Sequence, residues 1–301
     1  MSRLLVWVKA SRLPAQMFIF PCLLLGQGLY YSVYQTINWH IFIYIHMYGI
    51  FMHLFIVYAN DYADYDTDLI NNTFNIFTGG SRVLVDGILK RESLKLSAIT
   101  MFILSLVSGL IISISINNLL TFLFVLFGLK LLWAYSFPPI KLSYRGFGEV
   151  LQVIGVGIIL PLVGFFGQGG QIDYVPWKVI IFLLPIQLGM AIATSMPDRP
   201  SDTLSLKRTT VVIFGNRNSK YLVVILNFLS LLSIYLLKES LSNVNGVFMY
   251  FSPVFIIALL QLFLALSSSL DAGSEHLYYF VLLAILSNVS LILLVTYLAI
   301  T

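Results

Sequence analysis

The chain has 301 residues, of which 59% are hydrophobic and only 10% are charged, and its mean hydropathy is +0.92. Soluble domains carry about 25% charged residues, so this composition excludes an ordinary soluble domain and indicates an integral membrane protein. The net charge of +4 is typical of basic loops in such a protein rather than of nucleic-acid binding, and the single cysteine excludes a disulfide framework or a cysteine-based metal site.

The apolar segments predict an all-α, multi-pass membrane protein with one transmembrane domain covering residues 1–301. The N-terminal stretch MSRLLVWVKASRLPAQ interleaves basic and apolar residues and has no small-residue cleavage site, which argues against a removable signal peptide. A membrane span needs about 20 apolar residues. Cutting the chain at charged or Gly/Pro/Asn-rich points predicts nine spans: 14–34, 39–60, 93–116, 119–136, 147–167, 177–197, 220–237, 247–267 and 276–300.

The basic residues predict the orientation of these spans. Lys and Arg gather before the first span and in the connections after the second, fourth and sixth spans, whereas the alternate connections have almost none. Positively charged loops stay in the cytoplasm. We therefore expect a protein of the bacterial inner membrane with a cytoplasmic N-terminus and an external C-terminus.

Four carboxylates follow the second span in the stretch YANDYADYDTDLINN. If the helix continues past Asn60, successive residues turn by about 100°, so Asp61, Asp64 and Asp68 share one face while Asp66 points away. Like charges on one face destabilise a helix unless a positive group lies between them. The spacing therefore favours a bound cation.

A second acidic pair, Asp198 and Asp202, follows the sixth span and is predicted to lie on the same side of the membrane. Magnesium suits two such clusters because it binds a few carboxylates and completes its shell with water and phosphate oxygens. Opposed carboxylates with bridging metal ions would hold a diphosphate and make it a leaving group. Basic residues in the same connections could bind the remaining phosphate oxygens: Arg82, Lys141, Arg145, Lys207 and Arg208.

Other interpretations of these residues stay open at this point. Acids in a loop are often only a solvated surface, and basic loop residues are orientation signals first. His46 and His53 form a polar stripe on the second span, which in membranes more often makes interhelical hydrogen bonds than a metal site. A secondary transporter would place its functional acids near the membrane midplane, whereas these acids cluster at one surface.

The motifs resemble those of the UbiA-type intramembrane prenyltransferase superfamily over essentially the whole chain. The stretch NDYADYDTD matches the first family motif, N-D-x-x-D-x-x-x-D, at Asn60, Asp61, Asp64 and Asp68. A D-x-x-x-D motif followed by a G-K-x-T-like element is similar to the segment that contains Asp198, Asp202, Lys207 and Thr209. The stretch YSFPPIKLSYRGFGE resembles the Tyr…Lys connection of the family, with Tyr135 and Lys141 as counterparts.

The resemblance implies nine helices around a central cavity that opens at the cytoplasmic side. It implies Mg²⁺-dependent transfer of a prenyl group from a polyprenyl diphosphate to an aromatic acceptor. The implied metal ligands and catalytic residues are Asp61, Asp64, Asp68, Asp198 and Asp202. The implied substrate-binding residues are Asn60, Arg82, Tyr135, Lys141, Arg145 and Lys207.

The acceptor and the second motif show where the resemblance is less complete. The stretch TGGSRVLVDGIL resembles the branch that prenylates 1,4-dihydroxy-2-naphthoate in menaquinone synthesis. The alternatives are 4-hydroxybenzoate, non-quinone acceptors and an intramembrane terpene cyclase. Thr194 and Pro197 stand where many relatives have Asn and Arg, and Leu206 stands where Gly is common. Pro197 and Pro200 lie on either side of Asp198, and because proline breaks helices, the second cluster is expected on a kinked or restarted helix.

Overall fold

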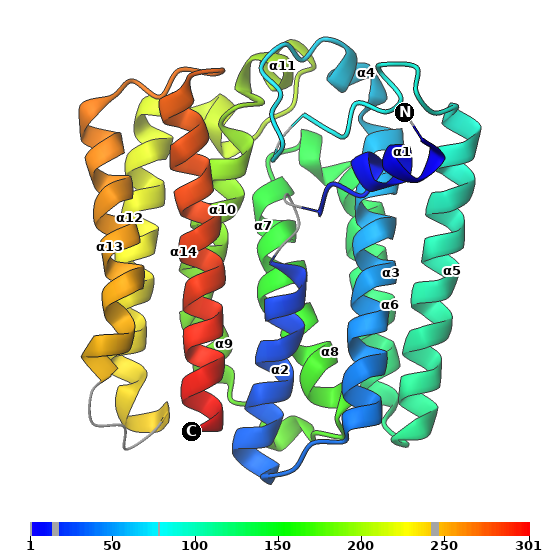
Figure 1. Ribbon diagram of the computed structural model, residues 1–301, viewed down its shortest axis with the longest axis vertical. Coiled ribbons are helices and arrows are strands. Elements are labelled where there is room, and N and C mark those ends of the chain that lie inside the picture. Colours follow the sequence, from blue (N-terminus) through cyan, green and yellow to red (C-terminus); the bar gives the residue numbers. More distant parts are fainter. Residues whose placement is uncertain (1, 14–17, 78, 242–246) are drawn as a thin grey trace.

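The computed structural model describes residues 2–13, 18–77, 79–241 and 247–301. Within these residues every regular element is helical, and the long helices run side by side in a single bundle (Figure 1). The expectation of an all-α fold is confirmed.

Each predicted span overlaps a long helix or a pair of stacked helices. They are α2 (Ile19–Tyr34), α3 (Trp39–Ala63), α5 (Arg91–Ser115), α6 (Leu119–Ser136), α7 (Gly148–Gln152) with α8 (Leu160–Gly167), α9 (Trp177–Phe182) with α10 (Leu184–Ser195), α12 (Thr210–Leu241), α13 (Val247–Ser267) and α14 (Glu275–Ile300). Between α7 and α8, residues Val153–Ile159 form a π-helical segment that widens the helix.

Six of these segments are long and apolar enough to cross a membrane. They are Trp39–Ala63, Arg91–Ser115, Leu119–Ser136, Gly148–Gly167, Trp177–Ser195 and Glu275–Ile300. Of the first predicted span, residues 14–17 lie outside the described residues, and its helix α2 begins at Ile19. Nine spans therefore stay a prediction.

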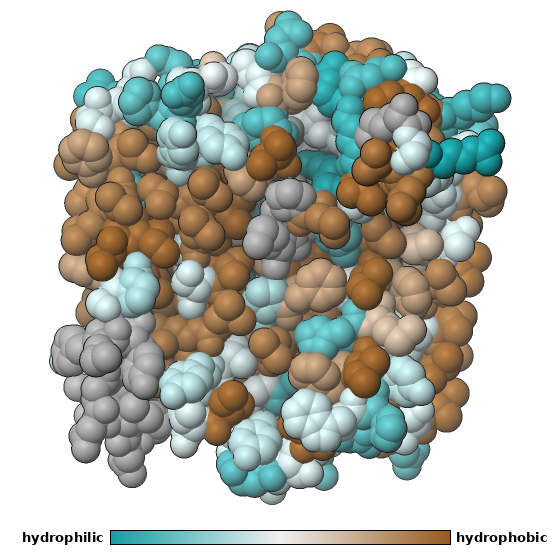
Figure 2. Space-filling model, in the orientation of Figure 1, coloured by the Kyte–Doolittle hydropathy of each residue, from teal (hydrophilic) through white to brown (hydrophobic). Residues whose placement is uncertain are grey.

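The two ends of the bundle differ. The short helices α1 (Arg3–Ala10), α4 (Tyr65–Leu69) and α11 (Arg199–Leu204) lie at the same end as the N-terminus, and the C-terminus lies at the opposite end (Figure 1). Figure 2 shows a mainly hydrophobic middle between two ends richer in hydrophilic residues. This surface is typical of a protein whose middle faces lipid.

Both acidic segments interrupt their helices. Helix α3 ends at Ala63, Asp64 has non-helical backbone angles (φ −93°, ψ 9°), and α4 starts at Tyr65. The helix thus continues past Asn60 only as far as Ala63, and Asp68 lies on the separate helix α4. In the second segment α10 ends at Ser195 and α11 begins after Asp198, so the restarted helix expected from the two prolines is confirmed.

Candidate functional site

A cavity of about 240 Å³ lies inside the bundle, with acidic residues on one part of its wall and apolar residues on another. The acidic part contains Asp64, Asp68, Asp198 and Asp202, which come from the segments at the N-terminal end of the bundle. The apolar part is formed by α3, α6 and the π-helical segment: Met52, Ile56, Val57, Leu131, Leu132, Val156 and Ile159. A ligand with a charged head and an apolar tail would match both parts.

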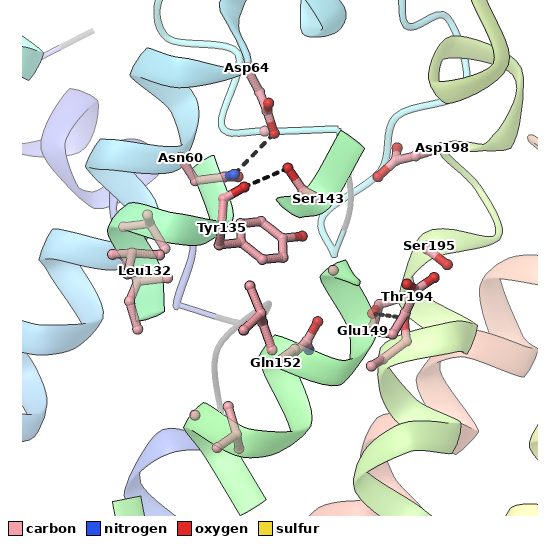
Figure 3. A pocket seen from close by; sticks show the side chains of 18 of the residues that line it. Asn60, Asp64, Leu132, Tyr135, Ser143, Glu149, Gln152, Thr194, Ser195 and Asp198 are labelled. Atoms are coloured by element: carbon pink, nitrogen blue, oxygen red, sulfur yellow. Dashed lines mark hydrogen bonds between the residues drawn. The ribbon is translucent and has the colours of Figure 1, made fainter. Parts of the chain in front are cut away.

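The fold brings the two acidic segments together at this cavity. Asp64 and Asp198 both line it, and their carboxylates are directed towards it from the two different segments (Figure 3). The Lys207 ammonium group joins the two segments, with its Nζ 3.1 Å from Asp64 Oδ2 and 3.7 Å from Asp202 Oδ1. The side chain of Lys207 is only 11% exposed, so this cation is held inside the site rather than in a solvated loop.

Asp64 and Asp198 each accept a hydrogen bond from an asparagine. Asn60 Nδ2 donates to Asp64 Oδ2 at 3.0 Å, and Asn71 Nδ2 donates to Asp198 Oδ1 at 2.8 Å. Asn71 is fixed in this orientation because its own Oδ1 accepts from the backbone N–H of Thr73 at 2.9 Å. Sequence reasoning missed Asn71, whose only signal is its position three residues after the first motif.

The loop of residues 79–81 contacts both acidic segments. The backbone N–H of Gly79 donates to Asp198, on the second segment. Gly80 has a φ of +70°, and a Cβ at this position would overlap the carboxylate of Asp68. Position 80 therefore requires glycine for two reasons: the backbone there is left-handed, and the Asp68 carboxylate leaves no room for a side chain.

Asp61 does not line the cavity, in contrast to its predicted place among the metal ligands. Its carboxylate accepts from Arg12 Nη1 at 3.3 Å and from the backbone N–H of Ser81 at 3.1 Å, and the Ser81 hydroxyl also donates to it. Arg12 Nη1 also contacts Asn60 Oδ1 at 3.4 Å and lines the cavity. Asp61 thus anchors the 79–81 loop, and Arg12 is a cavity cation that sequence reasoning assigned only to orientation.

The carboxylates of the site are crowded and shielded from water. Burial first, and then the charges of Asp64 and Asp61, raise the pKa of Asp68 to about 8. Burial also raises the pKa of Asp202 to about 7, although Lys207 opposes this effect. For Lys207 burial lowers the pKa, but Asp64 and Asp202 outweigh burial and hold the pKa well above its usual value.

The donor set fits Mg²⁺ only together with ligands from a substrate. Within the described residues, no three His, Cys, Asp or Glu side chains are arranged to hold a metal ion by themselves. Mg²⁺ commonly takes one or two carboxylates and completes its shell with waters and substrate phosphates. Crowded carboxylates whose protonation is favoured by burial and mutual repulsion have the excess negative charge that a divalent ion would offset.

Three predicted phosphate-binding cations do not line this cavity, as far as the described residues show. Arg82 Nη1 donates to the backbone carbonyl of Asp68 at 3.1 Å, so it supports the acidic loop from behind. Lys141 Nζ lies 3.6 Å from the centre of the Tyr144 ring. Arg145 is exposed and donates to a backbone carbonyl at 2.9 Å. The geometry gives their predicted phosphate role no support.

A second set of polar side chains lines the cavity below the acids. Tyr135, predicted from the sequence, is joined there by Glu149, Gln152 and Thr194, which sequence reasoning missed (Figure 3). Glu149 Oε1 accepts from the backbone N–H of Thr210 at 2.7 Å and so caps the start of α12. This set supplies hydrogen-bond partners between the acidic and apolar parts of the cavity.

The histidine stripe on α3 makes contacts between helices instead of a site. His46 Nε2 lies 3.2 Å from Gln27 Nε2, and His53 Nε2 lies 2.7 Å from the carbonyl oxygen of Ser11. Neither histidine lines the cavity. The interpretation as interhelical hydrogen bonding therefore holds.

Comparisons with known proteins agree with this architecture. Residues 18–285 match the model of the UbiA prenyltransferase family. The structure of a UbiA homolog from Archaeoglobus fulgidus bound to DMAPP and Mg²⁺ has a TM-score of 0.65 and 17% identity, covering 95% of this chain and 99% of that one. No match to the chain is found among curated proteins.

Two further structures share the fold. The apo structure of a UbiA homolog from Aeropyrum pernix K1 has a TM-score of 0.69 and 14% identity, covering 93% of this chain and 98% of that chain. A structure of digeranylgeranylglyceryl phosphate synthase has a TM-score of 0.64 and 17% identity, covering 100% of this chain and 99% of that one. At these identities the likeness shows the fold alone.

Proposed function

The chain belongs to the UbiA prenyltransferase family, and we propose that it transfers a prenyl group from a polyprenyl diphosphate to an aromatic acceptor with the help of Mg²⁺. The observation that carries this proposal is the meeting of Asp64 and Asp198 at one cavity that continues into an apolar interior (Figure 3). The structural relative from Archaeoglobus fulgidus is bound to DMAPP and Mg²⁺, which is the ligand pair that such a cavity would suit.

The acidic part of the cavity would hold the diphosphate. Mg²⁺, when bound, neutralises the charge of the diphosphate and makes it a better leaving group. The ligands proposed for it are the four aspartates that line the cavity: Asp64, Asp68, Asp198 and Asp202. Lys207 and Arg12 are cations on the same wall and would bind the oxygens that the metal leaves free.

The apolar part of the cavity would hold the prenyl tail. Along α3 its lining extends from Asn60 to Tyr48, which at 1.5 Å per residue is about 18 Å of helix. Where the two parts meet, the ring of Tyr135 lies against the cavity. An aromatic face at this point would stabilise positive charge that develops on the allylic carbon as diphosphate departs.

We propose 1,4-dihydroxy-2-naphthoate as the acceptor, and hence a role in menaquinone synthesis. Its support is the resemblance of the TGGSRVLVDGIL stretch to that branch, together with Gln152 and Thr194, which could bind acceptor hydroxyl groups near the reacting carbon. The competing acceptors are 4-hydroxybenzoate and, because one structural relative is a digeranylgeranylglyceryl phosphate synthase, a glycerol phosphate.

We also propose nine spans in the bacterial inner membrane, with the cavity opening to the cytoplasm. The basic connections support this orientation, and the opposite positions of the two termini agree with an odd number of spans (Figure 1). Single cysteines introduced at the exposed positions Lys90 and Lys178 are labelled from either side of the membrane to test it. Lys90 precedes the start of α5 and Lys178 lies in the first turn of α9, and the proposed topology puts them on opposite sides of the membrane.

The direct test of the function uses purified protein in lipid nanodiscs with Mg²⁺ and geranyl diphosphate. Each acceptor is supplied separately, and both released diphosphate and the prenylated product are measured. We expect Mg²⁺-dependent product with 1,4-dihydroxy-2-naphthoate and little with the other acceptors. Product only with another acceptor overturns the acceptor assignment, whereas folded protein that releases no diphosphate with any acceptor overturns the transferase proposal and favours a transporter.

A further inference from the structure

A second cavity, of about 520 Å³, lies between α3, α5 and α6 and shares no lining residue with the first. Several of its side chains are exposed, among them Ile99 at 46% and Trp133 at 44%, so it opens on the outer surface of the bundle. We call it the α5–α6 groove. Its wall is formed chiefly by Phe55, Ala59, Tyr62, Phe102, Leu126 and Trp133, with two lysines, Lys95 and Lys130.

The two lysines are the unusual feature of the groove. Lys130 is the only charged residue of α6, which is otherwise apolar enough to cross a membrane. Among the described residues neither the Lys95 nor the Lys130 side chain forms a hydrogen bond or an ion pair. Charged groups within membrane spans are costly and normally have a partner, and here the protein supplies none.

The lysines and the apolar side chains of the groove lie at different distances from the end of the bundle. Lys95 is four residues from the start of α5 and Lys130 six residues from the end of α6, which places them about 6 and 9 Å from the helix ends. Because a three-residue turn joins the antiparallel α5 and α6, these ends lie at the same face of the bundle. Phe102 and Leu126 lie about 15 Å from the same helix ends. The two cations therefore lie nearer the membrane surface, and the apolar side chains lie deeper in the membrane.

We propose that the α5–α6 groove binds one anionic glycerophospholipid. Its phosphate would lie between Lys95 and Lys130, and an acyl chain would follow the apolar wall towards Phe102 and Leu126. Trp133 lines the groove beside the lysines, at the depth where tryptophan favours the boundary between headgroups and hydrocarbon.

The charge and depth favour a lipid over other occupants. Lipid phosphates lie at the membrane surface, within reach of lysine side chains that extend towards it. A protein partner would have to place a carboxylate at the same depth, which is costly. A free phosphate would leave the apolar wall without a ligand. Arg91, whose guanidinium lies 4.7 Å from the centre of the Tyr62 ring, adds a further cation at the rim.

The test compares lipid retention by native mass spectrometry of the full chain in neutral detergent, after addition of phosphatidylglycerol or phosphatidylcholine. We expect the wild-type chain to retain one phosphatidylglycerol and to prefer it over phosphatidylcholine. The variant Lys95→Gln/Lys130→Gln should bind phosphatidylglycerol at least about tenfold more weakly, since each basic residue near the surface contributes to anionic-lipid binding. The control is Lys90→Gln, which removes an exposed charge at the start of the same helix but outside the groove.

Equal retention by the double variant and the wild type, or equal retention of both lipids by the wild type, overturns the proposal. A second variant keeps both lysines and so tests the proposal even where the double variant does not fold. Leu126→Trp fills the apolar wall and should also lose the lipid. Retained lipid in Leu126→Trp, or displacement of the lipid by soluble glycerol 3-phosphate, would contradict the acyl-chain contact.

Discussion

Replacing Asp64 by asparagine tests the electrostatic role of the site with little change of shape. The amide has the size of the carboxylate and its oxygen can still accept from Asn60, whose bond to Asp64 is 3.0 Å long. The substitution removes the charge that faces Lys207 at 3.1 Å. At an effective dielectric constant of 20, that pair has a Coulomb energy of about 5 kcal/mol, part of which the desolvation of both groups offsets.

We expect Asp64→Asn to reduce kcat/KM for the prenyl diphosphate by about 10²–10³-fold, the usual loss when one preorganised electrostatic group is removed. The matched control is Asp66→Asn in the same motif, because Asp66 is exposed on α4 and does not line the cavity. Diphosphate release is measured at saturating Mg²⁺, with gel filtration as a check of folding. Activity of Asp64→Asn within tenfold of wild type, or an equal loss in Asp66→Asn, would refute the reasoning.

Three further substitutions test the surroundings of the site. Lys207→Met should raise KM for the prenyl diphosphate more than tenfold, because the flanking carboxylates lose their cation, and Lys207→Arg should restore part of the affinity in the same assay. Gly80→Ala should cost activity at least tenfold, as its Cβ would overlap Asp68 and its φ of +70° is strained by about 1 kcal/mol or more for alanine; an unchanged rate would show that the loop can yield. Tyr144→Phe removes the 2.9 Å hydrogen bond to Thr67, worth about 1 kcal/mol, and a thermal melt should show a Tm lower by roughly 2–4 °C, whereas no change would mean that water replaces the hydroxyl.

Hydropathy located the helices because the cost of exposing backbone groups to lipid leaves few alternatives to an apolar helix. It did not predict the break at Asp64. The stretch there contains neither glycine nor proline, and the break accompanies contacts of Asp64 with Asn60 on its own helix and with Lys207 far away in the chain. In the second segment, by contrast, Pro197 and Pro200 correctly predicted that the helix restarts.

The acidic residues of the site could be predicted because their spacing is local, whereas their partners could not. Asp66 is exposed, as its spacing predicts. Arg82 and Lys207 look alike in the sequence, since both are basic residues in connections, but only Lys207 lines the cavity. Asn71 contacts an aspartate 127 positions later. Which cation or amide reaches the site depends on the course of the loops, and this is decided by contacts between distant segments.

The π-helical segment has a consequence for the length of lipid that the enzyme accepts. Gly155 lies in this segment and lines the cavity, and a Cβ at this position would meet no atom within 4 Å. A methyl group at position 155 would therefore fit without displacing a neighbour, and larger side chains there would take up space in the cavity. The side chain at this one position could therefore limit the length of the prenyl donor, with alanine, valine and leucine favouring progressively shorter isoprenoids.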